Sequence, residues 1–227
     1  MNDYEPYVCE AIEKIIEPGW VCADVGANVG QITTLLANLV KEKGKVIAFE
    51  ILPDNINELK ENIKNYSNVV VENLAISNTN DFIPIYPSSN GGSKEWNILG
   101  YDVRGIKTNK FIEVKASTMD EYFKTFTQLN FVKIDVEGAE FKVIEGMSNI
   151  LQKLRPYIIV EFHEEEGWEG RFNILKYDYS LFGLYTHGNK IFDWVDVNHT
   201  RIYHCLLVPN ELKENINAKL RSKKDES

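Results

Sequence analysis

The chain has 227 residues, 44% hydrophobic and 26% charged, which is enough for one well-buried core and typical of a soluble globular protein. Its formal net charge of -9 opposes attraction to a phosphate backbone and argues against nucleic acid as a partner. Cys9, Cys22 and Cys205 are odd in number and widely spaced, so we expect reduced, buried thiols and a cytoplasmic location.

The N-terminal segment carries acidic residues and no long apolar run, so we expect neither a signal peptide nor a membrane span. Apolar residues from Tyr4 to Ile16 recur with the spacing of one helix face, and Pro18-Gly19 ends the pattern. We predict a helix over about residues 4–16 that packs on a sheet. Covering the entrance of a ligand cleft is the alternative role.

The next stretch predicts a strand, a tight turn and a helix. The apolar run Trp20–Asp24 leads to Gly26 and Gly30, which flank Asn28, and a helical pattern follows over residues 31–41. Glycine adopts positive φ without steric cost, and asparagine tolerates it. The first amides of the helix have no intrahelical acceptors and point over the turn, which suits a nucleotide-like cofactor. A βα turn without any ligand is the alternative.

The second predicted strand, Lys45–Glu50, ends in an acid twenty positions after Gly30. A carboxylate at this place can accept hydrogen bonds from both hydroxyls of a ribose, so we expect an adenosine-bearing cofactor. The segment 26–30 lacks the G-x-G-x-x-G spacing of a nicotinamide dinucleotide site. A nicotinamide-dependent oxidoreductase therefore remains only as an alternative.

Further elements follow in a strand and helix rhythm that is broken once. We predict a helix from Pro53, a helix cap at 117–120 and strands over 69–72, 131–135 and 157–163. The rhythm is broken by the paired strands 82–86 and 111–115, which enclose an inserted loop, Pro87–Lys110. Late strands are predicted over 179–186, 191–197 and 203–208, the last two able to form a hairpin, and a fraying helical tail over 211–227. The pattern predicts one domain over residues 1–227. Its fold class is α/β: a three-layer, doubly wound Rossmann-like sheet, mostly parallel with an antiparallel C-terminal hairpin.

Four runs carry a resemblance to a known family. They are Asp24–Gly30, Ala48–Glu50 with Pro53 and Asn55, Lys133–Glu140 with Gly146, and Arg155-Pro156 followed by Glu161. In this order and spacing the chain resembles the FkbM family of methyltransferases, within the class I S-adenosylmethionine-dependent fold. The resemblance implies S-adenosyl-L-methionine as cofactor and O-methylation of a hydroxyl on a sugar or secondary metabolite, that is, a small-molecule or glycan acceptor.

The resemblance also implies roles for single residues. Gly26, Ala27, Asn28 and Gly30 would line the methionine and ribose part of the donor, Glu50 would hold the ribose diol, and Asn73 and Ala75 would border the adenine. Asp24 would orient the loop or receive the ammonium group of the donor. The alternative for Asp24 is that it only caps the start of the helix.

Candidate catalytic residues lie where the parallel strands are expected to end. Period-two alternation places Glu161 and His163 on one face of a strand, and Asp135 ends a neighbouring strand. We expect His163 to take the proton of the acceptor, with Asp135 as the second candidate base. Alternatively, Glu161 and His163 form a structural pair. The three residues can also be considered as a metal site, but no close-spaced ligand motif supports one, and none is expected.

The remaining polar and aromatic residues are weaker candidates. We expect His187, His199 and His204 to be surface or packing residues and Lys133 to be structural. Several aromatic or basic side chains are candidates for contact with the acceptor: Trp96, Tyr101, Arg104, Trp168 and Trp194. A protein that binds the donor without catalysis is the last alternative function.

Overall fold

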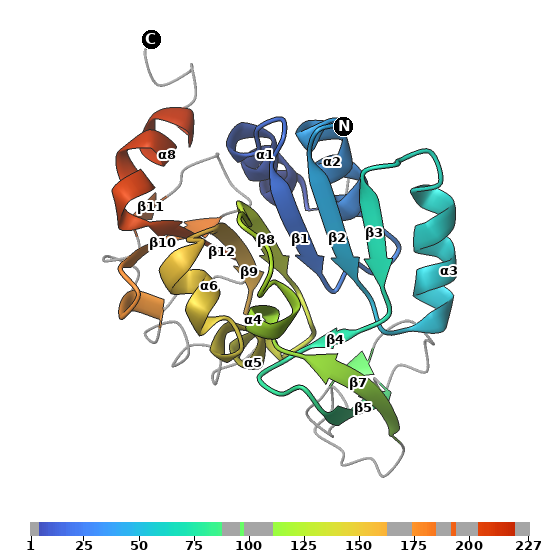
Figure 1. Cartoon of the computed structure of the whole chain (residues 1–227). Coiled ribbons are helices and arrows are strands. Elements are labelled where there is room, and N and C mark those ends of the chain that lie inside the picture. The colour runs from blue at the N-terminus through green and yellow to red at the C-terminus, as the bar shows by residue number, and fades with distance from the viewer. Residues whose placement is uncertain are drawn as a thin grey trace.

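A computed structural model describes residues 5–87, 96–97, 111–162, 174–184, 192–193 and 204–220. Its main sheet has the strand order β11-β10-β12-β9-β8-β1-β2-β3 (Figure 1). The strands are β1 (Val21–Val25), β2 (Lys45–Phe49), β3 (Val69–Glu72), β8 (Phe131–Ile134), β9 (Tyr157–Glu161), β10 (Tyr179–Leu184), β11 (Phe192–Asp193) and β12 (His204–Pro209). The five strands from β3 to β9 in this order pair in parallel, and β12, β10 and β11 are antiparallel. The expected mixed Rossmann-like sheet is therefore confirmed.

The pairing of the last strands differs from the expected hairpin. β12 lies between β9 and β10, with Leu206 opposite both Ile159 and Phe182, so both of its edges are occupied and β11 pairs with β10 instead. All of β12 is buried, as a strand inside a covered sheet must be. The continuous apolar run Cys205–Val208 is typical of such a strand, whereas a hairpin at the sheet edge would show alternation.

Helices cover both faces of the sheet. On one face lie α1 (Pro6–Ile15), α2 (Gln31–Val40), α3 (Pro53–Asn62) and α8 (Lys213–Leu220), and on the other α4 (Met119–Tyr122), α5 (Glu140–Glu145) and α6 (Ser148–Lys153) (Figure 1). Alternation along β1 separates the two cores, because Cys22 packs in the core of α1 and α2 while Ala23 packs in the core of α4 to α6. The three predicted layers are present.

Helix α1 packs as expected. Pro6 stands in its first turn, where a missing amide proton costs nothing, and Val8, Ile12 and Ile15 are buried against the sheet and α2. The tail contains a short 3-10 helix, Asn210–Leu212, before α8. The three cysteines are buried and form no disulfide. Among the described helices, none is long and apolar enough to cross a bilayer.

A second, smaller sheet stands at the carboxyl ends of β1 to β3 (Figure 1). It has the order β4-β7-β5-β6, with β4 (Ala75–Ile76), β5 (Phe82–Pro87), β6 (Trp96–Asn97) and β7 (Ile112–Ser117). The predicted pairing of β5 with β7 is confirmed, and so is the cap, since Thr118 Oγ1 accepts a hydrogen bond from the Glu121 amide at 3.1 Å. Apart from Pro87 and β6, the inserted loop lies outside the described residues.

Gly26 marks the point where β1 and β8 separate at their carboxyl ends. Its φ is 86°, and a Cβ atom at this position would lie 1.8 Å from the carbonyl oxygen of Asp135, the residue after β8. Only glycine allows the two chain segments to come this close. The backbone geometry of the turn is therefore fixed by contact with the neighbouring strand.

We expect Gly26→Ala to be much more destabilising than Gly19→Ala. Gly19 has a similar φ of 88°, but a Cβ added there would meet no atom within 4 Å, so its variant meets only the cost of a left-handed alanine, about 1–2 kcal/mol. Gly26→Ala adds a backbone clash of about 1–3 kcal/mol. Urea unfolding of both variants measures the difference, and equal losses would show that the contact with Asp135 is not tight.

Candidate active site

A cavity of about 300 Å³ opens at the carboxyl ends of β1, β2 and β8. Its walls are the glycine turn, the end of β2, the segment Leu74–Ser77, two isoleucines of β5 and the turn after β8. In a doubly wound sheet, the connections that follow two neighbouring parallel strands diverge at this point, and ligands bind in the space between them. The cavity is large enough for part of a small organic cofactor.

The glycine turn has the strained backbone that the sequence predicts. Gly26, Asn28 and Gly30 all have positive φ, and the amides of Gly26 and Ala27 donate to the carbonyl oxygen of Phe49 at 3.0 and 2.9 Å. Gly26 and Asn28 line the cavity, and Ala27 joins them around a small recess beside it. Gly30 instead faces α3, where a Cβ would lie 2.4 Å from Leu59 Cδ1. Glycine is favoured there by the φ of 90° and by the small space beside Leu59.

Glu50 ties this turn to the end of β2. Its Oε2 accepts from the Asn28 amide at 2.8 Å, and its Oε1 accepts from the amides of Ile51 and Leu52 at 2.9 and 2.8 Å. Each carboxylate oxygen has two lone pairs, so Oε1 is saturated and Oε2 retains one. The side chain lines the cavity and can accept one strong hydrogen bond from a ligand hydroxyl at Oε2.

Asp24 is 1% exposed and lies behind the turn. Its Oδ2 accepts from Thr33 Oγ1 at 2.6 Å, which joins β1 to the first turn of α2. Burial raises its pKa to about 6, although Thr33 and Lys133 act in the opposite direction. The carboxyl also borders the small recess, so it can orient the turn and still face a ligand group.

The two residues expected beside the adenine have different positions. Ala75 lines the cavity, whereas Asn73 is not among the described lining residues and donates its amide to the carbonyl oxygens of Glu50 and Ile51 at 3.1 and 3.2 Å. Asn55 also lines the cavity, although no role in donor binding was expected for it. It is buried, and its Oδ1 has no hydrogen-bond partner, so a ligand amino group would satisfy it.

Lys133 belongs to the site, which the sequence analysis did not foresee. Its side chain is buried, with Nζ 3.1 Å from Asp135 Oδ2, and both residues border the small recess. Burial lowers the pKa of Lys133, but the carboxylates of Asp135, Glu5 and Asp24 raise it more, so the lysine is charged. A lysine inside the apolar strand Phe131–Ile134, two positions before an acid, was the signal.

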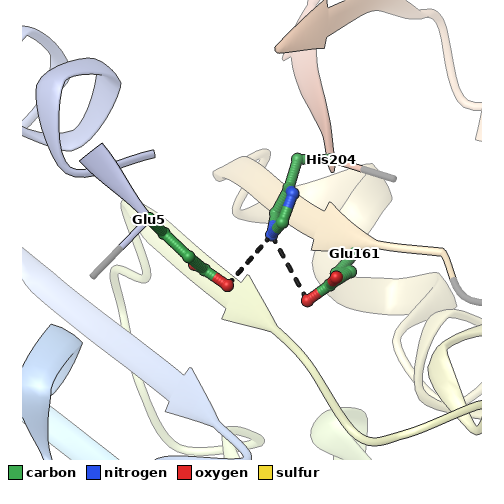
Figure 2. Close-up of side chains that lie close together, drawn as sticks. All are labelled: Glu5, Glu161 and His204. Carbon is green, nitrogen blue, oxygen red and sulfur yellow. Dashed lines mark ion pairs between the residues drawn. The ribbon is translucent and has the colours of Figure 1, made fainter. Parts of the chain in front are cut away.

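Glu161 meets a different histidine from the one expected (Figure 2). His204 Nε2 lies 3.3 Å from Glu161 Oε2 and 3.3 Å from Glu5 Oε1, and its Nδ1 is 2.8 Å from the hydroxyl oxygen of Tyr7. Of the two expectations for His204, the surface position is wrong: the residue is 3% exposed, and the pairing of β12 with β9 sets it opposite Glu161. His163 lies outside the described residues.

The two carboxylates of this second cluster favour the charged form of its histidine. Burial lowers the pKa of His204, but Glu161 and Glu5 raise it more, and the net shift is upward. Burial and the same two carboxylates raise the pKa of Tyr7 to about 12. Glu5 and Tyr7 come from the start of α1, so this helix both packs on the sheet and brings polar groups to the site.

A family model supplies the identification. The methyltransferase FkbM domain matches residues 24–203. The chain belongs to this family. Among curated proteins it is 31% identical over 143 residues to the hexuronic acid methyltransferase AglP of Haloferax volcanii, covering 62% of this chain and 54% of AglP. It is 25% identical over 174 residues to the 2-O-methyltransferase NoeI of Sinorhizobium fredii, covering 71% of each. The chain thus spans about half the length of AglP.

Two solved methyltransferase structures share the fold of this chain. Methyltransferase FkbM from Methylobacillus flagellatus superposes with a TM-score of 0.54 at 16% identity, over 88% of this chain and 50% of that one. Aeropyrum pernix fibrillarin, in complex with S-adenosyl-L-methionine, gives 0.51 at 10% identity, over 88% and 73%. At such identities these likenesses show the fold alone. The family makes this a methyltransferase domain, which sets aside the nicotinamide-dependent oxidoreductase as an alternative.

We expect Asp24→Asn to change how stability depends on pH. The folded protein holds the Asp24 proton more tightly than the unfolded chain, because burial raises the pKa from 3.8 to about 6. Stability from this carboxyl is therefore complete below its unfolded pKa and is lost as the pH rises through its folded pKa. At about 1.4 kcal/mol per pH unit the loss is about 3 kcal/mol.

Denaturant unfolding of the wild type and Asp24→Asn, from below the unfolded pKa of 3.8 to above the folded pKa of about 6, measures the effect. The asparagine variant should lack this decline, so the stability difference between the two proteins should change by about 3 kcal/mol in its favour on going to higher pH. A difference that stays constant with pH would contradict the burial of an ionisable group at this position.

Proposed function

We propose that this domain transfers the methyl group of S-adenosylmethionine to a hydroxyl group of a sugar-containing acceptor. The observation that carries the proposal is the cavity at the end of β1 and β2, where an anchored carboxylate, Glu50, meets the glycine turn in a chain of the FkbM family. The names of AglP and NoeI supply the acceptor class, a uronic acid in one case and a 2-O position in the other.

The donor would lie across the glycine turn. Gly26, Ala27 and Asn28 would face its methionine and ribose part, with Gly30 holding the turn against α3. The remaining lone pair of Glu50 Oε2 suits one ribose hydroxyl. The carboxyl of Asp24 borders the small recess and would face the ammonium group.

The adenine would lie at the apolar end of the cavity. Ala75 and Ile51 line this part, and the unsatisfied Oδ1 of Asn55 offers an acceptor for the exocyclic amino group. Asn73 would act indirectly, since it holds the backbone at the end of β2.

Asp135 is placed best among the described candidates to assist the reaction. It borders both the cavity and the recess, and the methyl group of the donor would lie between these two spaces. Lys133 keeps a positive charge beside it. The acceptor oxygen would attack the methyl carbon, the carbon–sulfur bond would break with its electrons passing to sulfur, and Asp135 would accept the hydroxyl proton. Alignment of the reactants can supply ~7–11 kcal/mol and a base a further ~100- to 10,000-fold.

Glu161 would belong to the acceptor side of the site, next to His204. His163 remains the other predicted base. If the chain only binds the donor and does not catalyse transfer, no acceptor will receive the methyl group.

The test of the reaction uses S-adenosylmethionine labelled on its methyl group, with a panel of neutral sugars, amino sugars and uronic acids. We expect label on a sugar and expect it to survive alkali, because a methyl ether is stable there whereas a methyl ester on a uronate hydrolyses. Alkali-labile label would contradict hydroxyl transfer, and no label on any member would contradict the acceptor class.

We expect Asp135→Asn to lower kcat by ~100- to 10,000-fold while the affinity for S-adenosylhomocysteine changes little. Asp54→Asn, on the exposed surface of α3, is the matched control and should keep the wild-type kcat. Asp135→Asn removes the ion-pair partner of Lys133 and could disturb folding. A thermal shift on adding S-adenosylhomocysteine therefore checks that this variant is folded. A folded Asp135→Asn enzyme with the wild-type rate would remove Asp135 from proton transfer.

A further inference from the structure

Glu5, Glu161 and His204 form a cluster that the proposed donor site does not use (Figure 2). Glu5 immediately precedes α1, Glu161 ends β9 and His204 begins β12. One ligand atom from each residue lies within 4.8 Å of the other two. Three distant parts of the sequence therefore present two carboxylates and an imidazole to one point.

The imidazole is aimed into this point without a well-formed hydrogen bond. The His204 side chain is 3% exposed, and its Nε2 lies at 3.3 Å from an oxygen of each glutamate. A charge-assisted hydrogen bond is shorter, about 2.7–2.9 Å, and Nε2 has no partner with hydrogen-bond geometry. Glu5 Oε2 is also buried without such a partner. Buried polar atoms whose contacts are only long ion pairs need an explanation, and an ion between them is one.

The other face of the imidazole is held as in a metal-binding histidine. Nδ1 lies 2.8 Å from the Tyr7 hydroxyl oxygen. When Nδ1–H donates to this oxygen, the lone pair of the ring is on Nε2, between the carboxylates. Histidines that bind metal ions nearly always donate their second ring N–H to such an acceptor, which fixes the tautomer and the ring orientation.

We propose that Glu5, Glu161 and His204 bind a divalent ion of the first transition row. Ligand atoms that surround such an ion at about 2.0–2.2 Å are separated from one another by about 3–3.5 Å, and both nitrogen–oxygen distances are 3.3 Å. One imidazole and two carboxylates suit Mn²⁺, Fe²⁺ or Zn²⁺, and three protein ligands leave coordination positions open.

The surrounding charge favours a cation. Besides the two glutamates of the cluster, Asp24 and Asp135 act on Lys133, whose Nζ lies 3.1 Å from Asp135 Oδ2 and 3.9 Å from Glu5 Oε2. The four carboxylates thus outnumber this lysine. A divalent ion bound by a neutral histidine compensates more of their charge than a protonated histidine does.

The role of the ion rests on the proposed function. Lys133 connects the cluster to Asp135, so an ion there would lie on the acceptor side of the methyl group. Its open positions would take the hydroxyl oxygens of the acceptor. A coordinated hydroxyl loses its proton more easily, and the proton passes to Asp135 as the oxygen–methyl bond forms and the carbon–sulfur bond breaks.

The binding test needs no acceptor. Metal-free full-length protein is titrated with Mn²⁺ while electron paramagnetic resonance follows the free ion, a probe chosen because manganese prefers oxygen ligands to the thiols of this chain. We expect one bound ion per chain, displaced by Zn²⁺. Glu161→Gln and His204→Gln should each weaken binding more than ~10-fold, and Tyr7→Phe by ~10- to 100-fold.

Glu13→Gln is the control, an exposed glutamate on α1 outside the cluster, and should bind Mn²⁺ like the wild type. Each variant must still bind S-adenosylhomocysteine, which shows that it is folded. Absence of Mn²⁺ and Zn²⁺ binding, or equal weakening by Glu13→Gln and His204→Gln, would overturn the proposal and leave His204 as an imidazolium between two carboxylates.

Activity then separates the two proposals. If chelation abolishes transfer to a sugar and Mn²⁺ restores it, the ion acts as described. If Mn²⁺ binds at the cluster and no sugar is methylated, the metal site stands and the acceptor class is wrong. Full transfer after chelation, with donor binding intact, would overturn the role of the ion and leave the proposed function in place.

Discussion

The hydrogen bonds of the Glu50 carboxylate are the constraint on which the donor site depends. One carboxylate accepts backbone amides from both sides of the cavity, from Asn28 in the glycine turn and from Ile51 and Leu52 after β2. Hydrogen bonds to a charged acceptor are stronger than neutral ones, and each amide would otherwise be an unsatisfied donor. The carboxylate thereby holds the two walls at a fixed separation before any ligand arrives.

A second set of charged groups extends from this site toward the antiparallel strands. Lys133 contacts Asp135 at the end of β8 and approaches Glu5, and Glu5 leads to His204 and Glu161. These groups are buried or partly buried at the end of the sheet where the chain leaves β8 and β9 and where β12 begins. In the proposed function the first site binds the methyl donor, and in the proposed metal site the second set of groups activates the acceptor.

The glycine turn and its contact with Glu50 could be predicted from the sequence because their signals are local. Gly26, Asn28 and Glu50 lie at the ends of two adjacent strands, and the spacing alone places them together. Local patterns also predicted the helices and the β5–β7 pair. The exact duties of Gly30 and Asn73 could not be read in this way, because each depends on a packing partner or carbonyl group that the sequence does not identify.

The cluster of Glu5, Glu161 and His204 could not be predicted, because it depends on the register between β12 and β9. His163 is the histidine nearest to Glu161 in the sequence, but His204 is brought opposite Glu161 by a pairing between strands some forty residues apart. Glu5 and Tyr7 come from the other end of the chain. The expected terminal hairpin left the second neighbour of β12 open, and the observed pairing of β12 with β9 is what brings the cluster together.

The most direct measurement is a calorimetric cycle between Glu50 and the donor ribose. S-Adenosylhomocysteine and an analogue whose ribose lacks both hydroxyls are each titrated into the wild type and Glu50→Gln. If the carboxylate grips the ribose, removing the hydroxyls weakens wild-type binding by about tenfold or more, and weakens the variant much less. An equal loss in both proteins, or no binding of S-adenosylhomocysteine to the wild type, would contradict this account.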